Sequence, residues 1–200
     1  MRRVPAATPW PAFADLFAGV TGAVLLLMLA AVVSQAQLAE RYQQAHAELE
    51  AMRLERAALE AKLAQDLEAL IAAGLVDLDH GVVAIQGSLL FQTGSAELSQ
   101  EGADLLERAA PALASWASGG AIMVAGHTDD VPIASALYAS NWELSTARAT
   151  NVVTLLEALG LDGERLFAAG FGEHRPVAPN DAAEGRQENR RVELTRVSST

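Results

Sequence analysis

The chain has 200 residues, a net charge of −11 and no cysteine. Its 25 acidic residues outnumber 14 basic ones, which argues against nucleic acid as a partner because phosphate binding depends on an excess of Lys and Arg. Without cysteine there can be no disulfide and no thiolate metal site. The length allows one membrane segment and one soluble domain of about 120 residues, but not a large enzyme.

An uncharged apolar run extends from Leu16 to Val33 and is directly preceded by one acidic residue, Asp15. A helix needs roughly 20 apolar residues to cross the hydrocarbon core of a bilayer, and this run has about that length. The run therefore predicts a single transmembrane helix at 12–34, with Asp15 inside or at the edge of the membrane. A carboxylate there is costly unless it is paired, hydrated or neutralised, and such residues usually face an ion path. The alternative role for Asp15 is a helix-start residue in the headgroup region.

The charges that flank this run predict its orientation. Two arginines precede it, and the first charges after it are Glu40 and Arg41, so the positive-inside rule places residues 1–11 in the cytoplasm. The chain is then a bitopic protein of the bacterial inner membrane with a periplasmic C-terminal domain. A cleaved signal peptide is the competing interpretation, because Ser-Gln-Ala at 34–36 imitates a cleavage site. Signal peptides have shorter apolar regions, of about 7 to 15 residues, which favours the membrane helix.

Beyond the apolar run, apolar residues recur at alternating steps of four and three, which is a heptad pattern. The pattern predicts a helical connector over 35–74 that pairs with a second copy of the chain, giving a homodimer. Arg56 and Asp66 occupy two positions of this seam, so we expect a short or interrupted coiled coil. The alternative is an amphipathic helix that lies on its own domain. The apolar seam positions are 38, 42, 45, 49, 52, 59, 63 and 70.

Two helices are expected within the remaining domain, residues 75–200. The first begins near Gln100 after a serine cap, and Pro111 should kink or split it. The second begins with the capping box Ser140-x-x-Glu143 and ends at Gly160, where a left-handed residue can stop it.

Apolar and β-branched runs predict strands at 81–91, 121–126, 166–172 and 192–197. Strands and helices alternate along the chain until the last strand. This order predicts an α+β fold, a small mixed sheet with helices on one face.

The residues around Asp15 carry a family resemblance. Phe13-Ala14-Asp15-Leu16, followed by a single apolar span, resembles the membrane helix of flagellar stator B subunits, the MotB family. The resemblance implies that Asp15 carries the transported ion, a proton rather than sodium, and that two copies sit within a ring of multi-span, MotA-like subunits. Each charge that crosses gains about 2.3 kcal/mol per 100 mV, enough to bias a conformational step. Phe17-Ala18 depart from the Met-Thr that is usual in this family.

Four blocks of the soluble domain, in order, resemble the OmpA-type peptidoglycan-binding domain in the variant found in stator B subunits. The resemblance extends from near Gly81 to the end of the sequence. It implies an OmpA-like fold whose ligand is the peptidoglycan stem peptide. The blocks are Gly126-His127-Thr128-Asp129-Asp130-x-Pro132, Asn141-Trp142-x-Leu144-Ser145-x-x-Arg148-Ala149, Gly170-x-Gly172-Glu173-x-x-Pro176 and Asn189-Arg190-Arg191-Val192-Glu193.

The diaminopimelate side chain of that peptide ends in an ammonium and a carboxylate. A site for it needs one anion and one planar, bidentate cation, which Asp and Arg provide. By residue match these are Asp129 and Arg148, and Asn141 lies seven residues before Arg148 on the same helix face. The alternative is an internal salt bridge between Asp129 and Arg148. The residues expected to bind peptidoglycan are Asp129, Arg148, Asn141, Thr128, Asn189 and Arg190, with Phe91 as a further lining residue.

The sequence gives no sign of an enzyme, a metal site or a cofactor. Four scattered histidines have no zinc-ligand spacing, and no nucleophile occurs with a base. The main alternatives to a flagellar stator subunit are a non-flagellar ion-driven motor, such as that of the Zorya anti-phage system, and a passive wall anchor in which Asp15 carries no ion.

Overall fold

The computed structural model describes residues 10–92, 94–118, 120–133, 135 and 137–198. The arginines at positions 2 and 3, on which the orientation prediction depends, lie outside the described residues. The chain divides into two compact units, Met1–Arg56 and Ala57–Thr200. The helices are α1 (Trp10–Asp66), α2 (Glu68–Ala72), α3 (Gly87–Leu90), α4 (Gln100–Trp116), α5 (Asn141–Ala158), the 3₁₀ helix η1 (Gly163–Arg165) and α6 (Ala183–Asn189).

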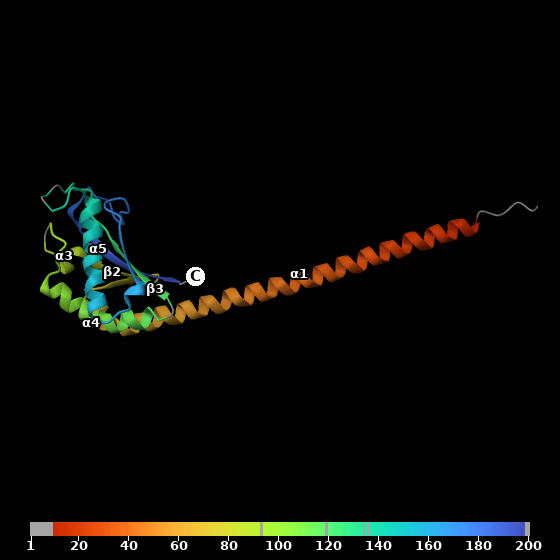
Figure 1. Ribbon diagram of the computed structural model, residues 1–200, viewed down its shortest axis with the longest axis horizontal. Coiled ribbons are helices and arrows are strands. Elements are labelled where there is room, and N and C mark those ends of the chain that lie inside the picture. Colours follow the sequence, from red (N-terminus) through yellow and green to blue (C-terminus); the bar gives the residue numbers. More distant parts are fainter. Residues whose placement is uncertain (1–9, 93, 119, 134, 136, 199–200) are drawn as a thin grey trace, which may run out of the picture. The chain divides into compact units, whose positions relative to one another are not determined.

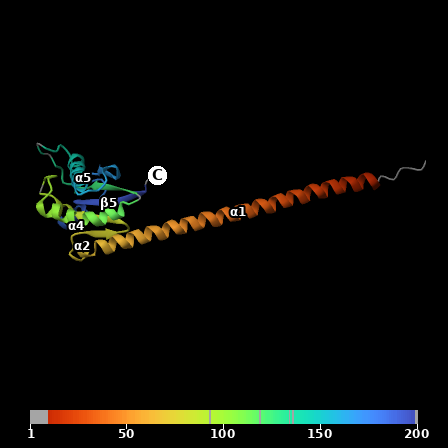
Figure 2. The same ribbon diagram turned by 60° about the horizontal axis from the view of Figure 1, so that its bottom comes forward.

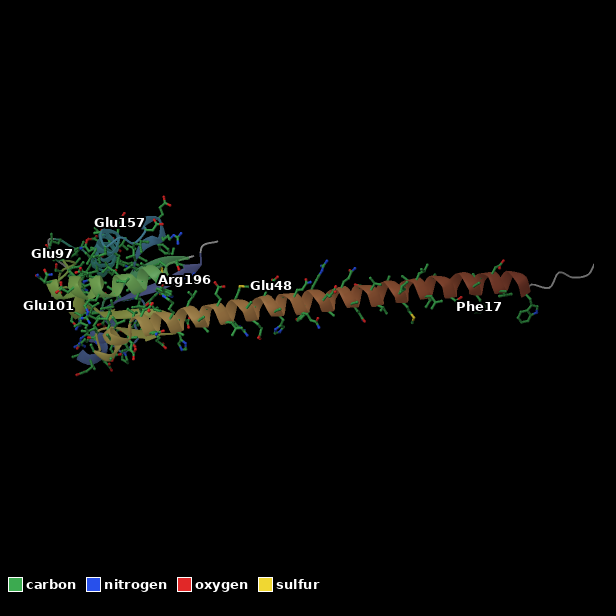
Figure 3. All side chains as sticks on the ribbon, turned by 90° about the horizontal axis from the view of Figure 1, so that it is seen from below. Phe17, Glu48, Glu97, Glu101, Glu157 and Arg196 are labelled. Carbon is green, nitrogen blue, oxygen red and sulfur yellow. The ribbon has the colours of Figure 1, made fainter. Side chains whose placement is uncertain are left out.

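The described part of the first unit is the N-terminal portion of α1. This helix is long and apolar enough to cross a membrane, and none of its most apolar window is buried. Side chains such as Phe17 and Glu48 project outward from it (Figure 3). The hydroxyl of Thr21 donates to the carbonyl of Phe17 at 2.8 Å, so this polar group is satisfied within the helix, as a hydrocarbon environment requires. The unit fits a single-pass membrane segment.

The second unit is built on a five-stranded mixed sheet with the order β1-β2-β5-β3-β4 (Figure 1). Only the β3–β4 pair is parallel among the strand pairs of the described residues. The strands are β1 (Asp77–Asp79), β2 (Val82–Gln86), β3 (Gly120–Gly126), β4 (Leu166–Gly170) and β5 (Arg191–Ser198).

One face of this sheet is buried beneath α4 and α5 (Figures 1 and 2). Alternate residues of the central strands, such as Ile85, Val124 and Leu194, point into this core and are almost fully buried. Their neighbours Ala84 and Thr195 are only partly buried on the opposite face. The expected α+β fold with helices on one face is therefore confirmed.

The end of α1 and the short α2 also belong to the second unit. Leu63, Leu67 and Leu70 are buried in its core, and Leu59 packs against that core. Three of the expected seam positions, 59, 63 and 70, are therefore occupied by contacts within the domain itself. This part of the connector is therefore an amphipathic helix that packs on its own domain, the alternative to the coiled coil that the heptad pattern predicts. The apolar seam residues of the first unit are exposed; they are Leu38, Tyr42, Ala45, Leu49 and Met52.

The expected helix signals are confirmed. The hydroxyl of Ser99 accepts from the backbone N–H of Gly102 at 2.9 Å at the start of α4. At the start of α5, Ser140 accepts from the N–H of Glu143, and the Glu143 carboxylate accepts from the N–H of Ala139. After α5, Gly160 has a φ of +97°, the left-handed conformation that glycine adopts at little cost.

One local prediction is wrong, and the split of α4 that was one of two expected effects of Pro111 is not observed. The strand expected over 81–91 ends at Gln86, because Gly87 turns the chain into α3 and donates its N–H to the carbonyl of Arg190 at 2.7 Å. A Cβ at Gly87 would lie 2.9 Å from that carbonyl oxygen, so the close approach requires glycine. Pro111 does not split α4, which continues to Trp116, because the buried face of the helix compensates for one missing hydrogen bond.

Candidate functional site

The site begins where β3 ends at Gly126 and the chain turns through Thr128 to Asp129. A Cβ at Gly126 would lie only 2.1 Å from the carbonyl oxygen of Ser145, so α5 can approach this strand closely only because position 126 is glycine. The close packing brings the first turns of α5, including Asn141, beside the Asp129 turn.

Asp129 is held by several hydrogen bonds. Its Oδ2 accepts from Nη1 of Arg190 at 2.5 Å, and its Oδ1 accepts from the N–H of Val131 at 3.3 Å. The amide of Asn141 donates to the carbonyls of Asp129 and Val131, and the Thr128 hydroxyl also donates to the Asp129 carbonyl. The turn is therefore rigid, and its carboxylate is occupied by an arginine of the same chain.

Arg148 of α5 is 6% exposed. Its Nε donates to the carbonyl of Ser95 at 2.9 Å, and its guanidinium carbon lies 5.0 Å from the centroid of the Phe91 ring. Burial is the main influence on its pKa and lowers it; Arg190 lowers it further, while Tyr138 and Asp129 raise it. No carboxylate among the described residues forms an ion pair with Arg148. The internal Asp129–Arg148 salt bridge considered from the sequence is therefore not observed.

We call Asp129, Arg148 and Arg190 the charged cluster. It contains two cations and one anion, so it carries a net positive charge and favours a ligand with a carboxylate. An arginine presents a planar fork to such a group, and Asp129 offers an acceptor for a ligand cation. The cluster is suited to a zwitterion.

The other expected binding residues have mainly supporting positions. Asn189 is fully buried; its Oδ1 accepts from the N–H groups of Val177 and Ala178, and its Nδ2 donates to the carbonyl of Ala178 and to Oδ1 of Asn180. This uses the hydrogen-bonding capacity of its amide. Asn141 and Thr128 fix the Asp129 turn.

Asp15 does not belong to this site. It lies in the first unit, on α1, with an exposed side chain. The resemblance assigned it a separate role, which stays a prediction.

A second group of side chains begins at His127, two residues before Asp129. The sequence patterns assigned no role to this group. His127 is 2% exposed, stacks on Phe171 and places its Nε2 3.5 Å from Oε2 of Glu193. Arg191 donates to the other oxygen of Glu193 at 2.7 Å. The contacts with His127 and Arg191 lower the pKa of Glu193 to about 2. His127, Arg191 and Glu193 stand within the matched blocks of the sequence, so the signal for this group was present, but the block pattern gave these three residues no role.

The lowered pKa of Glu193 makes the stability of the domain depend on pH. A carboxyl whose pKa is lower in the folded than in the unfolded state stabilises the fold above its ordinary pKa, 4.5, and loses that contribution as the pH falls towards about 2. We expect the thermal midpoint of the full chain in detergent to fall more between pH 7 and pH 3 in the wild type than in Glu193→Gln. Glu107→Gln, at an exposed position of α4, should behave as the wild type does. An equal acid-induced fall in Glu193→Gln would contradict the assignment.

The charged cluster lies within the part of the chain, residues 90–190, that matches the OmpA family. Motility protein B of Bacillus subtilis (strain 168) is 40% identical over 114 residues, 56% of this chain and 43% of the relative. Motility protein B of Helicobacter pylori (strain J99) is 33% identical over 122 residues, 60% of this chain and 48% of the relative. The matched part of the chain thus spans less than half the length of each of these two proteins.

Solved structures give the same result for the fold. The cell wall anchor of the T6SS from Pseudomonas aeruginosa has a TM-score of 0.63 and 42% sequence identity, over 68% of this chain and 97% of that one. A putative MotB like protein from Desulfovibrio vulgaris has a TM-score of 0.60 and 31% identity, over 72% and 95% of the two chains. The periplasmic domain of Helicobacter pylori MotB has a TM-score of 0.57 and 28% identity, over 62% and 82%. The match to the OmpA family covers half of the 200-residue chain and contains the charged cluster. The chain therefore belongs to the OmpA family.

Proposed function

We propose that the chain is the wall-anchored, ion-conducting B subunit of an ion-driven motor in the bacterial inner membrane, and that its C-terminal domain binds the peptidoglycan stem peptide. The observation that carries the wall-binding half is Arg148, a buried guanidinium without a carboxylate partner among the described residues. A buried charge of this kind is costly unless a partner compensates it. A ligand carboxylate supplies that partner. The relatives named Motility protein B support the motor half.

Binding proceeds by an exchange of partners. The carboxylate of the diaminopimelate side chain pairs with Arg148, and the ammonium takes the place of Arg190 at Asp129. Arg190, 39% exposed in its side chain, then turns to a carboxylate of the ligand. Each charge that loses its internal partner gains one from the ligand, so the exchange leaves no buried charge unpaired. The chain performs no covalent chemistry.

The membrane half uses α1 and Asp15. The apolar part of α1 crosses the membrane with the N-terminus in the cytoplasm, and Asp15 accepts and releases a proton as the motor turns. Two copies pair along the exposed seam residues Leu38, Tyr42, Leu49 and Met52. A ring of MotA-like subunits surrounds the pair. The proposal holds for a flagellar motor and for a related motor such as that of the Zorya system.

Sedimentation with purified peptidoglycan tests the wall-binding half. We expect the full chain in detergent to sediment with diaminopimelate-containing sacculi, and Asp129→Asn to lose at least about tenfold in affinity, since its side chain can no longer pair with the ammonium. The neighbouring carboxylate offers a matched control: Asp130 is exposed, so Asp130→Asn should bind as the wild type does. Wild-type binding by Asp129→Asn would refute the site.

A passive wall anchor is the second candidate function. It is favoured by the 42% identity to the structure from Pseudomonas aeruginosa, which is described as the cell wall anchor of the T6SS. This candidate keeps the charged cluster as the wall-binding site and removes the ion role of Asp15. The two candidates therefore differ only in what Asp15 does.

A further inference from the structure

His127 places an imidazole in the interior of the domain without a hydrogen-bond partner for its ring. The side chain is 2% exposed, and neither ring nitrogen forms a hydrogen bond among the described residues. Buried polar atoms are almost always paired, so this exception requires an explanation. The ring is nevertheless held in place, because it stacks on Phe171 with centroids 5.3 Å apart and an interplanar angle of 18°. A histidine fixed in this way can change its charge without changing its position.

The segments that carry the Asp129–Arg190 ion pair meet at this ring. The backbone N–H of His127 donates to the carbonyl of Arg191, at the start of β5, at 3.0 Å. The next residue along the chain donates its N–H to the carbonyl of Gly172, in the turn after β4, also at 3.0 Å. Asp129 lies two residues after the ring, and Arg190 directly precedes Arg191. The charge of the ring therefore acts on the backbone that positions both members of the ion pair.

One carboxylate faces the ring. Oε2 of Glu193 is 3.5 Å from Nε2 of His127, while Oε1 of Glu193 accepts from Nε of Arg191 at 2.7 Å. The pKa of Glu193 is lowered to about 2, so this carboxylate is charged between pH 5 and pH 8. Histidine is the side chain whose charge ordinarily changes in this range. A proton on His127 turns the contact with Glu193 into an ion pair, which is stronger than the contact of a carboxylate with a neutral ring.

The other charged groups of the surrounding segments have contacts of their own. In the turn after β4, the guanidinium of Arg175 lies over the aromatic ring on which the imidazole stacks, and Glu173 lies 3.9 Å from His174. On α5, Nε of Arg148 is bonded to a backbone carbonyl. Among the carboxylates of the part of the chain that the structure describes, only Glu193 forms an ion-pair contact with the buried imidazole. A proton on the ring therefore acts through Glu193.

We infer that His127 is a positioning residue for the charged cluster, and that its protonation strengthens the binding of the wall peptide in mildly acidic surroundings. The ion pair with Glu193 fixes the start of β5 against the turn after β3, and these two segments carry Arg190 and Asp129. A preformed arrangement lowers the ordering cost of binding. The added positive charge also favours the stem peptide, which carries more carboxylates than ammonium groups. The inference rests on the proposed function, because it concerns the regulation of the same site.

Binding to diaminopimelate-containing sacculi at pH 5.5 and pH 7.5 tests the role of this charge. We expect the full chain in detergent to bind about fivefold more tightly at pH 5.5, the lower end of the range for two coupled sites, here a proton and a peptide. In His127→Gln, which cannot take up the proton, this increase should vanish. In Glu193→Gln it should vanish too, because an unpaired charge at a buried position is costly and the ring then stays neutral.

His174 provides the matched control, because it is a histidine of the neighbouring turn with a side chain that is 54% exposed. His174→Gln should keep the wild-type increase, and circular dichroism checks that the variants fold. A purely structural His127 would give a defect of equal size at both pH values in His127→Gln, which would overturn the inference.

Two further outcomes separate this inference from the proposed function. A wild type that binds sacculi equally at both pH values, or a full increase in Glu193→Gln, overturns the role of His127 and leaves the wall-binding site in place. The Glu193→Gln result decides the question even if His127→Gln does not fold. If the wild type binds sacculi at neither pH, the proposed wall-binding function fails, and the role of His127 fails with it.

Discussion

Replacing Arg148 with lysine is expected to reduce the affinity of the full chain for diaminopimelate-containing peptidoglycan at least about tenfold, although the charge is kept. The reason is geometric: a guanidinium can present two parallel N–H groups to a carboxylate, while an ammonium is a point charge. Arg148 is also fixed by its bond to the Ser95 carbonyl and by the Phe91 ring, so the fork is oriented before the ligand arrives. Co-sedimentation with sacculi measures the loss.

Two controls separate a binding defect from a folding defect. Arg108→Lys changes an exposed arginine of α4 in the same domain and should bind as the wild type does. Thermal denaturation of Arg148→Lys should show a cooperative transition, since Ala149 and Val152, which anchor α5 in the core, are untouched. A folded Arg148→Lys protein with wild-type affinity would exclude bidentate recognition of a carboxylate by this residue.

Replacing Asp15 with asparagine is expected to abolish ion flux and to leave wall binding unchanged. Asparagine keeps the shape of the side chain but cannot take up and release a proton. Flux is measured as acidification of the interior of vesicles that contain the chain and its ring-forming partner. Asp15→Glu, which keeps a titrating group, should retain part of the flux.

The matched control is Glu40→Gln, because Glu40 is the first acidic residue of α1 after the apolar run and lies beyond it. We expect this variant to conduct as the wild type does. If Asp15→Asn conducts ions as the wild type does in these vesicles, Asp15 does not carry the ion. The passive wall anchor is then the function of the chain. Wall binding by the same preparation shows that the protein is folded in either case.

Local patterns predicted those parts of the fold that depend on neighbouring residues. Ser99 and Ser140 cap helices because a hydroxyl three residues before an unpaired N–H can reach it, and this information lies within one turn. The turn at Gly87 was not predictable in this way, because its hydrogen bond goes to Arg190, which is distant in sequence. The helix α6, Ala183–Asn189, was not among the two helices expected for the domain, for a similar reason: the buried Asn189 that ends it is held by contacts with residues 177–180.

The candidate site was predictable as a set of residues but not as a set of contacts. The sequence blocks identified Asp129, Arg148 and Arg190, and the structure brings them together. The choice of Arg190 as the partner of Asp129 depends on how β5 and the β3 turn meet, which no spacing along the chain reveals. The contact between His127 and Glu193 was missed for the same reason, since its two residues are far apart in the sequence.

The Asp129–Arg190 ion pair has a consequence for selectivity among soluble compounds. An arginine tethered beside its carboxylate acts as an internal competitor with an effective concentration on the order of millimolar. On the proposed function, free amines and isolated wall fragments in the periplasm must outcompete it one molecule at a time. The intact wall presents many stem peptides on one polymer, and the proposed dimer, if it engages two of them together, gains by avidity. The domain is then occupied by the wall itself rather than by the fragments released during its turnover.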